Sequence, residues 1–91
     1  MSSAQHCGKF RDTILSDLGD VPISATQKYR VLIIRDSVTG EVVTSAQRWW
    51  RESREHEWVV GKGFKLDKQQ SRELAFLLLE ASSKLDNYTQ N

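Results

Sequence analysis

The stretch KYRVLIIRDSVTGEVVTSAQRWW, residues 28–50, decides the fold of this 91-residue chain. Residues 28–35 are rich in β-branched and aromatic side chains. Around their centre consecutive residues are apolar, so both faces of a strand would be apolar there, which is typical of a strand covered on both faces. Asp36 and Gly40 frame a turn, because Asp favours turn entry and Gly tolerates a positive φ. Residues 41–50 then return as a second strand, so the stretch predicts an antiparallel hairpin.

The chain after this hairpin predicts two more short strands. Residues 51–56 are polar and charged throughout, which suits an exposed connection. Residues 57–60 form the predicted third strand, Gly61 and Gly63 allow a tight corner, and residues 64–66 form a short fourth strand.

The last third of the chain predicts one helix. Asp67 and Gln70 have the spacing of a capping box, in which the carboxylate accepts an amide proton and the Gln side chain reaches back. Because apolar side chains then cover much of the helix girth, one sheet cannot bury them all, and we expect a homodimer through the helix, with Phe76, Leu78 and Leu79 at the contact. The apolar positions are Leu74, Ala75, Phe76, Leu77, Leu78, Leu79, Ala81 and Leu85.

These segments predict an α+β fold of ββββα order, a curved four-stranded antiparallel sheet followed by one amphipathic helix. The first 27 residues are expected to lie outside it. Phe10, Ile14 and Leu18 recur at helical spacing and predict a short helix, whereas residues 20–27 with Pro22 have the composition of a linker. The expected organisation is an N-terminal tail over residues 1–27, a domain over 28–85 and a C-terminal tail over 86–91.

Few residues in the chain could carry catalysis. Cys7 has no partner thiol, and His6 and His56 lack the spacing of a metal site. We therefore expect no catalytic residues, no metal and no cofactor, and we do not expect an enzyme. No apolar run approaches the roughly 20 residues of a membrane span, and the N-terminus lacks the pattern of a secretory signal. The expected location is intracellular, in the cytoplasm, the nucleoid or the nucleus, with no membrane partner.

Two adjacent tryptophans carry the functional prediction. Trp49 and Trp50 lie next to each other on a predicted strand, so their side chains must leave opposite faces of the sheet. An exposed ring can stack on a nucleic-acid base without demanding a sequence, and basic side chains around it can neutralise phosphates. The predicted nucleic-acid contacts are Lys28, Arg30, Arg35, Gln47, Trp50, Arg51, Trp58, Lys62 and Lys65.

The charge distribution is compatible with such a site. The formal net charge of the chain is only +1, whereas residues 28–65 carry eight basic and five acidic side chains, a local charge of +3. An alternative stays open, in which both tryptophans lie in the core or a dimer contact. The basic residues would then form a solvated face offset by Glu52, Glu55 and Glu57.

From Ile34 to the end of the helix, the order of motifs resembles the DNA-binding domain of the positive cofactor four family of transcriptional coactivators. The motifs are a strand ending in Arg35-Asp36, a glycine turn, an aromatic pair whose second member is Trp50, a polar loop, the Lys62-Gly63 corner and an amphipathic helix. The resemblance implies a dimer whose helices pair and whose curved sheets form grooves for single-stranded or unwound DNA. It points to Arg35, Trp50 and Lys62 as DNA contacts and to Trp49 as an interior residue. The sequence departs from the family pattern at Ser37, Gln47 and Gly61.

We therefore predict a dimeric protein that binds single-stranded DNA or RNA with little sequence preference. It would act in transcription regulation, replication or repair, with transcription or replication proteins as further partners. The alternative is a dimeric protein-interaction module on the same fold, a polymerase-associated cofactor whose sheet binds protein and binds nucleic acid weakly or not at all.

Overall fold

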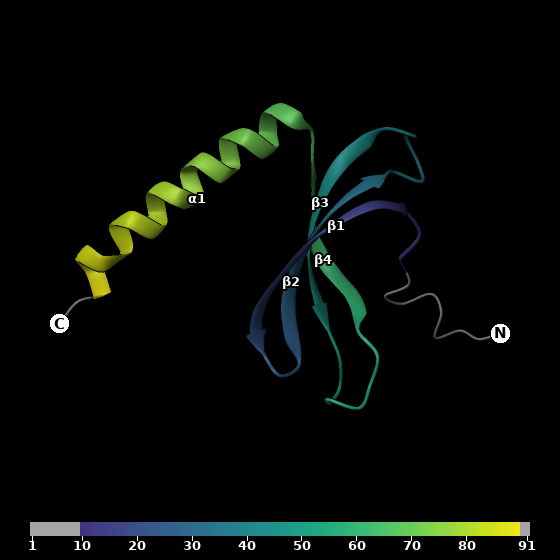
Figure 1. Ribbon diagram of the computed structural model, residues 1–91, viewed down its shortest axis with the longest axis horizontal. Coiled ribbons are helices and arrows are strands. Elements are labelled where there is room, and N and C mark those ends of the chain that lie inside the picture. The colour runs from purple at the N-terminus through teal and green to yellow at the C-terminus, as the bar shows by residue number, and fades with distance from the viewer. Residues whose placement is uncertain (1–9, 90–91) are drawn as a thin grey trace.

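A computed structural model describes residues 10–89 as one antiparallel sheet followed by one helix (Figure 1). The strands lie side by side in the order β1-β2-β3-β4, and the predicted ββββα class is confirmed. The elements are β1 (Thr13–Ser24), β2 (Gln27–Arg35), β3 (Val42–Trp50), β4 (Val59–Leu66) and α1 (Lys68–Thr89).

The predicted hairpin is confirmed, because β2 pairs antiparallel with β3 from Gln27 to Arg35. In the turn between them, the Asp36 carboxylate accepts hydrogen bonds from the amides of Val38 at 2.7 Å and Thr39 at 2.9 Å. Gly40 adopts a φ of +78° and donates its amide proton to the carbonyl oxygen of Asp36 at 2.9 Å. A left-handed backbone at this position is the conformation that glycine adopts without steric cost.

The segment before the hairpin is a strand, so the predicted helix and linker are wrong. β1 pairs with β2 along its whole length, which brings Ile14, Leu18 and most of residues 20–27 into the sheet. The sheet therefore begins within the segment that was expected to be a tail. Residues 1–9, with His6 and Cys7, lie outside the described part of the chain.

Irregular pairing explains why β1 does not look like a strand in the sequence. Its register against β2 shifts in three places, and each shift breaks the alternation of side chains that marks a strand. Pro22 is tolerated because β1 is an edge strand, where one row of amides needs no partner. The shifts fall between Ile14 and Ser16, between Asp17 and Gly19, and between Pro22 and Ser24.

The two short strands predicted after the hairpin are one continuous strand, β4. Gly61 and Gly63 do not form a corner but let β4 pass close to β3. A Cβ atom on Gly63 would overlap the carbonyl oxygen of Ala46, and one on Gly61 would lie 2.9 Å from the carbonyl oxygen of Arg48. The sheet still has four strands because β1 supplies the one that this merger removes.

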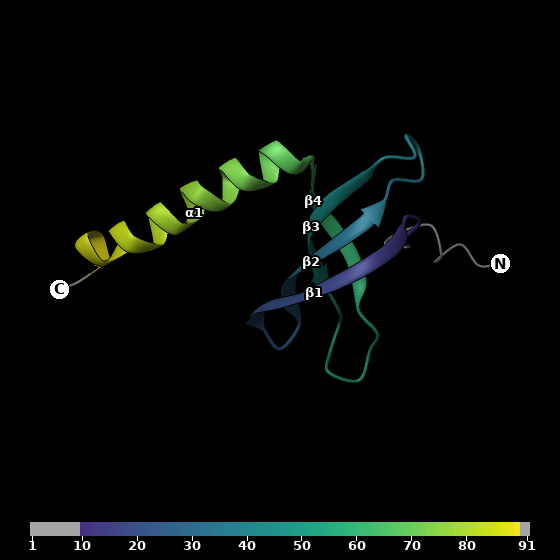
Figure 2. The same cartoon turned by 45° about the horizontal axis from the view of Figure 1, so that its top comes forward.

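The predicted capping box is confirmed at the start of α1. The amide of Gln70 donates to the Asp67 carboxylate at 2.7 Å, and the amide of Asp67 donates to the Gln70 side chain at 3.0 Å. The helix continues to Thr89, so the boundary expected at residue 85 is too early. Beyond its first turns α1 projects away from the sheet and does not cover it (Figures 1 and 2).

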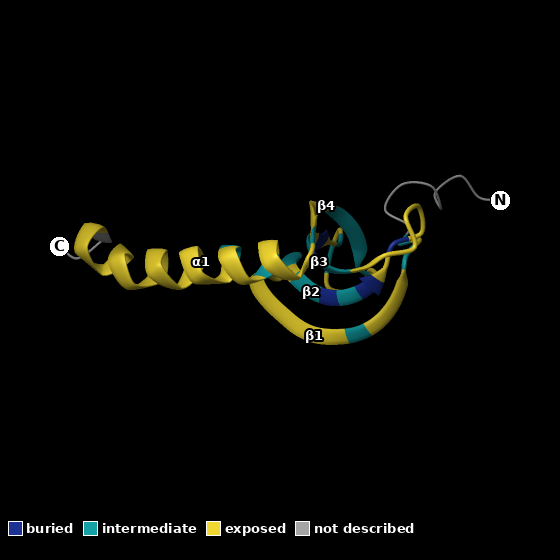
Figure 3. Cartoon of the chain, turned by 90° about the horizontal axis from the view of Figure 1, so that it is seen from above, coloured by how far each residue is buried: buried dark blue, intermediate teal, exposed yellow. Residues whose placement is uncertain are grey.

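The buried core is small and lies entirely on one face of the sheet. Leu32, Ile34 and Trp49 are its buried apolar residues, and they confirm the interior position predicted for Trp49. Phe10, Val43, Trp58 and Val60 pack against them. Figure 3 shows the buried residues in the sheet and its β2–β3 turn, whereas α1 is almost entirely exposed.

Candidate nucleic-acid interface

The pairing register divides the strand side chains into two faces. Lys28 pairs with Trp49 and Leu32 with Ser45, and directly paired residues share a face. We call this the Trp49 face; it carries Lys28, Arg30, Leu32, Ile34, Ser45, Gln47, Trp49, Val60 and Lys65. We call the opposite side the Trp50 face; it carries Tyr29, Val31, Arg35, Ala46, Arg48, Trp50 and Phe64.

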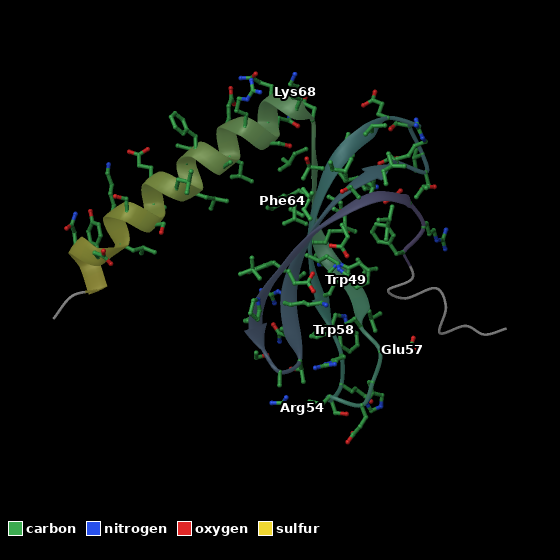
Figure 4. The ribbon with its side chains drawn as sticks, in the orientation of Figure 1. Trp49, Arg54, Glu57, Trp58, Phe64 and Lys68 are labelled. Atoms are coloured by element: carbon green, nitrogen blue, oxygen red, sulfur yellow. The ribbon has the colours of Figure 1, made fainter. Side chains whose placement is uncertain are left out.

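The Trp50 face presents three exposed aromatic rings on three neighbouring strands. Tyr29 on β2 is 46% exposed, Trp50 on β3 is 44% exposed and Phe64 on β4 is 56% exposed. They line a groove of about 960 Å³ between the sheet and the first turns of α1. Figure 4 shows Phe64 on the side of the sheet toward α1. The remaining lining residues are Val21, Val31, Ala46, Arg48, Gly61, Lys62, Gly63, Leu74 and Leu78.

Two cations in this groove have no carboxylate partner among the described residues. The guanidinium of Arg48 lies over the ring of Tyr29, 5.9 Å from its centroid, and makes no ion pair within residues 10–89. Lys62 is exposed and likewise makes none in that range. Both charges are therefore available to an anionic ligand.

Gly61 keeps the edge of the Trp50 ring accessible. A Cβ atom at Gly61 would lie 3.5 Å from Cδ1 of Trp50, in van der Waals contact. Since glycine has no side chain, that edge of the ring stays open to the groove. A ligand can therefore approach both the ring and the neighbouring backbone closely.

The Trp49 face also gathers basic and aromatic side chains, but its strand cations are already paired. Nζ of Lys28 lies 2.7 Å from the Asp20 carboxylate, and Arg30 contacts Asp20 at 3.2 Å and Asp17 at 3.3 Å. These cations also stack on rings, Lys28 at 4.4 Å from the centroid of Trp58 and Arg30 at 5.0 Å from that of Trp49. The hydrogen bond from Lys28 holds the pKa of Asp20 below its usual value.

Lys65 is the centre of a second paired cluster on the Trp49 face. Its ammonium lies 2.7 Å from the Asp36 carboxylate and 3.0 Å from that of Asp12. The hydrogen bond from Lys65, together with those from the Thr39 and Val38 amides, lowers the pKa of Asp36 to about 2. The two carboxylates raise the pKa of Lys65. This cluster ties the start of β1 to the β2–β3 turn and to β4.

The predicted nucleic-acid residues therefore do not form one surface. Arg35, Trp50 and Lys62 lie on or beside the Trp50 face, and the Arg35 guanidinium donates to the carbonyl oxygen of Gly40 at 3.0 Å. Most of the others lie on the Trp49 face, where Gln47 accepts a hydrogen bond from the buried Ser45 hydroxyl at 2.7 Å. These are Lys28, Arg30, Gln47 and Lys65. Trp58 packs against the core, and the guanidinium of Arg51 lies 4.2 Å from the centroid of the Trp58 ring.

Two corrections follow for the aromatic platform. Trp58 does not extend the surface of Trp50, because it packs against the core on the opposite face. Sequence reasoning also misses Tyr29 and Phe64. Tyr29 pairs with Arg48, and Phe64 pairs with Ala46. Tyr29 could have been found from the hairpin, because it pairs with Arg48, which lies two residues before Trp50 on the same face. Phe64 could not, because its position depends on the pairing of β4 with β3, which is irregular between Gln47 and Trp49.

The described residues offer no group of three His, Cys, Asp or Glu side chains that could hold a metal ion. His56 lies 3.3 Å from the Glu52 carboxylate and is within hydrogen-bond distance of the Ser53 hydroxyl, all in the exposed β3–β4 connection. Between residues 10 and 89, no helix is long and apolar enough to cross a membrane.

Comparison with known protein families, with curated proteins and with solved structures gives no match to this chain. The resemblance to the positive cofactor four family therefore stays a prediction from the order of sequence motifs.

Proposed function

We propose that this protein binds single-stranded DNA or RNA with little sequence preference, using the groove on the Trp50 face. The observation that carries the proposal is the set of three exposed rings, Tyr29, Trp50 and Phe64, beside the unpaired cations Arg48 and Lys62. Unstacked bases present flat apolar faces to such rings, and each base stacked on an aromatic side chain contributes about 1–3 kcal/mol. Cations beside the rings neutralise the phosphates that connect the bases.

The Trp50 face is a better candidate than the Trp49 face for a physical reason. A phosphate that binds Lys28 or Arg30 must first displace Asp20 or Asp17, whereas Arg48 and Lys62 have no such partner to lose within the described chain. Duplex is a poor ligand for either face, since paired bases hide their faces inside the stack. The proposed role is at unwound nucleic acid, in transcription, replication or repair.

We further propose that the binding protein is a homodimer through α1. The apolar side chains of α1 are largely exposed in the single chain, with Phe76 at 77%, Leu79 at 70% and Leu78 at 60%. Large apolar side chains exposed in this number along one helix mark an interaction site. A second copy of the helix has the complementary apolar surface, and its pairing would supply the burial that the small core of the sheet lacks.

The test of binding is fluorescence anisotropy with a labelled single-stranded oligonucleotide and its duplex. Wild type should bind the single strand more tightly, and Trp50→Ala should weaken that binding while the protein stays folded and dimeric. Ser53→Ala, in the exposed connection away from the groove, is the matched control. Equal affinity for both nucleic acids would defeat the stacking mechanism. If Trp50→Ala instead becomes monomeric, the groove would be the binding site for the helix of a second copy.

A protein-interaction module is the second candidate function, and the composition of the groove favours it. Val21, Val31, Ala46, Leu74 and Leu78 make much of its lining apolar, which also suits the side chains of a protein partner. A salt titration separates the two candidates. Binding to phosphates weakens steeply as salt is raised, whereas apolar contacts persist.

A further inference from the structure

The cations of the Trp49 face have the chemistry of a nucleic-acid site, but carboxylates of β1 occupy them. Asp20 bridges both cations, with one oxygen 2.7 Å from Nζ of Lys28 and the other 3.2 Å from Nε of Arg30. Asp17 adds a second contact to Arg30 at 3.3 Å. The cations in turn lie over the rings of Trp58 and Trp49.

The carboxylates form the outer layer of this arrangement. The side chain of Lys28 is 11% exposed and that of Arg30 is 25% exposed, whereas Asp20 and Asp17 are 34% and 47% exposed. A carboxylate and a phosphate both accept short charge-assisted hydrogen bonds from Lys and Arg. Asp17 and Asp20 therefore stand where the phosphates of a bound strand would stand.

We propose that the Trp49 face holds a masked phosphate-binding site for single-stranded nucleic acid, made by Lys28 and Arg30 and covered by Asp17 and Asp20. The ligand class is the polynucleotide backbone, and the mask is the acidic segment of β1. This inference does not require the groove on the Trp50 face, because it uses different cations on the opposite side of the sheet.

The position of the mask makes its displacement feasible. β1 is an edge strand whose register is interrupted three times, and its apolar side chains Leu18, Val21 and Ile23 are exposed. Segments with little buried apolar surface separate from a fold at a lower free energy than core strands. The start of the strand is held by Asp12, which binds Lys65 at 3.0 Å and accepts the Ser37 amide at 2.7 Å. The half that carries Asp17 and Asp20 lies beyond this anchor.

The test replaces both carboxylates in the full chain, Asp17→Asn with Asp20→Asn, and measures anisotropy with a labelled oligothymidylate across a salt series. The matched control is Glu41→Gln with Asp86→Asn, which removes the same charge at two positions without ion pairs in the described chain. Removal of each partly exposed ion pair should raise the affinity roughly two- to fivefold. If Lys28 and Arg30 each gain a phosphate, the slope of log K against log salt should steepen by about 0.7 per contact, about 1.4 in total. The control should leave the slope unchanged.

Two further variants decide the interpretation. Adding Lys28→Gln should remove part of the gain, and the gain should persist in a Trp50→Ala background. A doubly substituted protein that is folded but binds no better than the control, or that gains affinity without a steeper slope, would overturn the masked site. If the double variant does not fold, Asp17→Asn alone removes one of the two carboxylates at Arg30 and leaves Asp20 in place. It should raise the affinity roughly twofold without the full change in slope, and an unchanged affinity would overturn the masked site. Binding by the double variant but not by wild type would support the masked site and refute the proposed function.

Discussion

Trp49 and Trp50 are neighbours in the chain, yet they lie on opposite sides of the sheet and differ in their roles. Trp49 is 7% exposed, packs at 5.6 Å from the ring of Phe10 and belongs to the core. Trp50 is 44% exposed and lines the groove beside α1. Trp49 and Trp50 both lie on β3, but Trp49 is a structural residue of the core and Trp50 is a candidate binding residue.

This separation predicts different losses for the two alanine substitutions. Trp49→Ala removes a buried ring and should lower the free energy of unfolding by about 3–5 kcal/mol. Trp50→Ala should leave folding nearly intact and weaken single-strand binding by the worth of about one stacked base, about 1–3 kcal/mol. Urea unfolding and anisotropy on both variants check this. Similar unfolding curves for the two variants would contradict the assignment of the faces.

The charge of Lys62 predicts a loss of binding that depends on salt. Because Lys62 is exposed and has no ion pair among residues 10–89, its contribution to binding should come from its charge. Lys62→Gln should weaken single-strand binding at low salt and lose its effect as salt is raised, whereas the effect of Trp50→Ala should persist. Anisotropy at two salt concentrations measures both. Lys68→Gln, at the start of α1 and outside the groove lining, serves as the control for the lost charge.

The sequence predicts the fold well where local patterns are regular. The hairpin from residue 28 to 50 and the capping box at Asp67 follow from side-chain types whose preferences are local. β1 could not be predicted in the same way, because three register shifts and Pro22 erase its alternation, and only pairing with the free edge of β2 makes it a strand. The candidate site was found in part. Trp50 and Lys62 follow from the motifs, but Phe64 joins them only through the irregular pairing of β4 with β3.

The place of β1 in the sheet predicts that the N-terminal segment is required for folding. A chain that begins at residue 27 would lose all of β1 and its pairing with β2. It would also lose the bond from Lys65 to Asp12 and the partners of Lys28 and Arg30. Cooperative thermal unfolding should therefore be lost or shifted to a much lower temperature. A chain that begins at residue 10 keeps every described contact and is the control, and circular dichroism melting compares the two. An unchanged transition in the shorter chain would show that β1 contributes nothing to stability.

The exposed apolar surface of α1 predicts that charge will disrupt self-association. Leu79→Glu or Phe76→Glu should convert a dimer into a monomer, because a charge buried at a helix contact without a partner is strongly unfavourable. Val38→Glu puts the same charge on an exposed apolar position in the β2–β3 turn, away from α1, and should leave the dimer intact. Sedimentation at micromolar concentration gives the oligomeric state. A wild-type protein that sediments as a monomer would refute the proposed dimer.

The pairing of Asp36 with Lys65 predicts how stability falls in acid. The pKa of Asp36 is lowered to about 2 in the folded chain, first by the Lys65 hydrogen bond and then by the amides of Thr39 and Val38. A carboxyl group whose folded pKa lies below its unfolded value of about 3.9 contributes stability that is fully present above the unfolded pKa. That contribution is lost as the pH falls from about 4 toward about 2. Asp36→Asn keeps an oxygen for the two amides but has no charge for Lys65, so it should melt at a lower temperature than wild type near neutral pH. The difference between the two melting temperatures should shrink as the pH falls through this window. A difference that stays constant down to about pH 2 would show that the ion pair is not the source of the stabilisation.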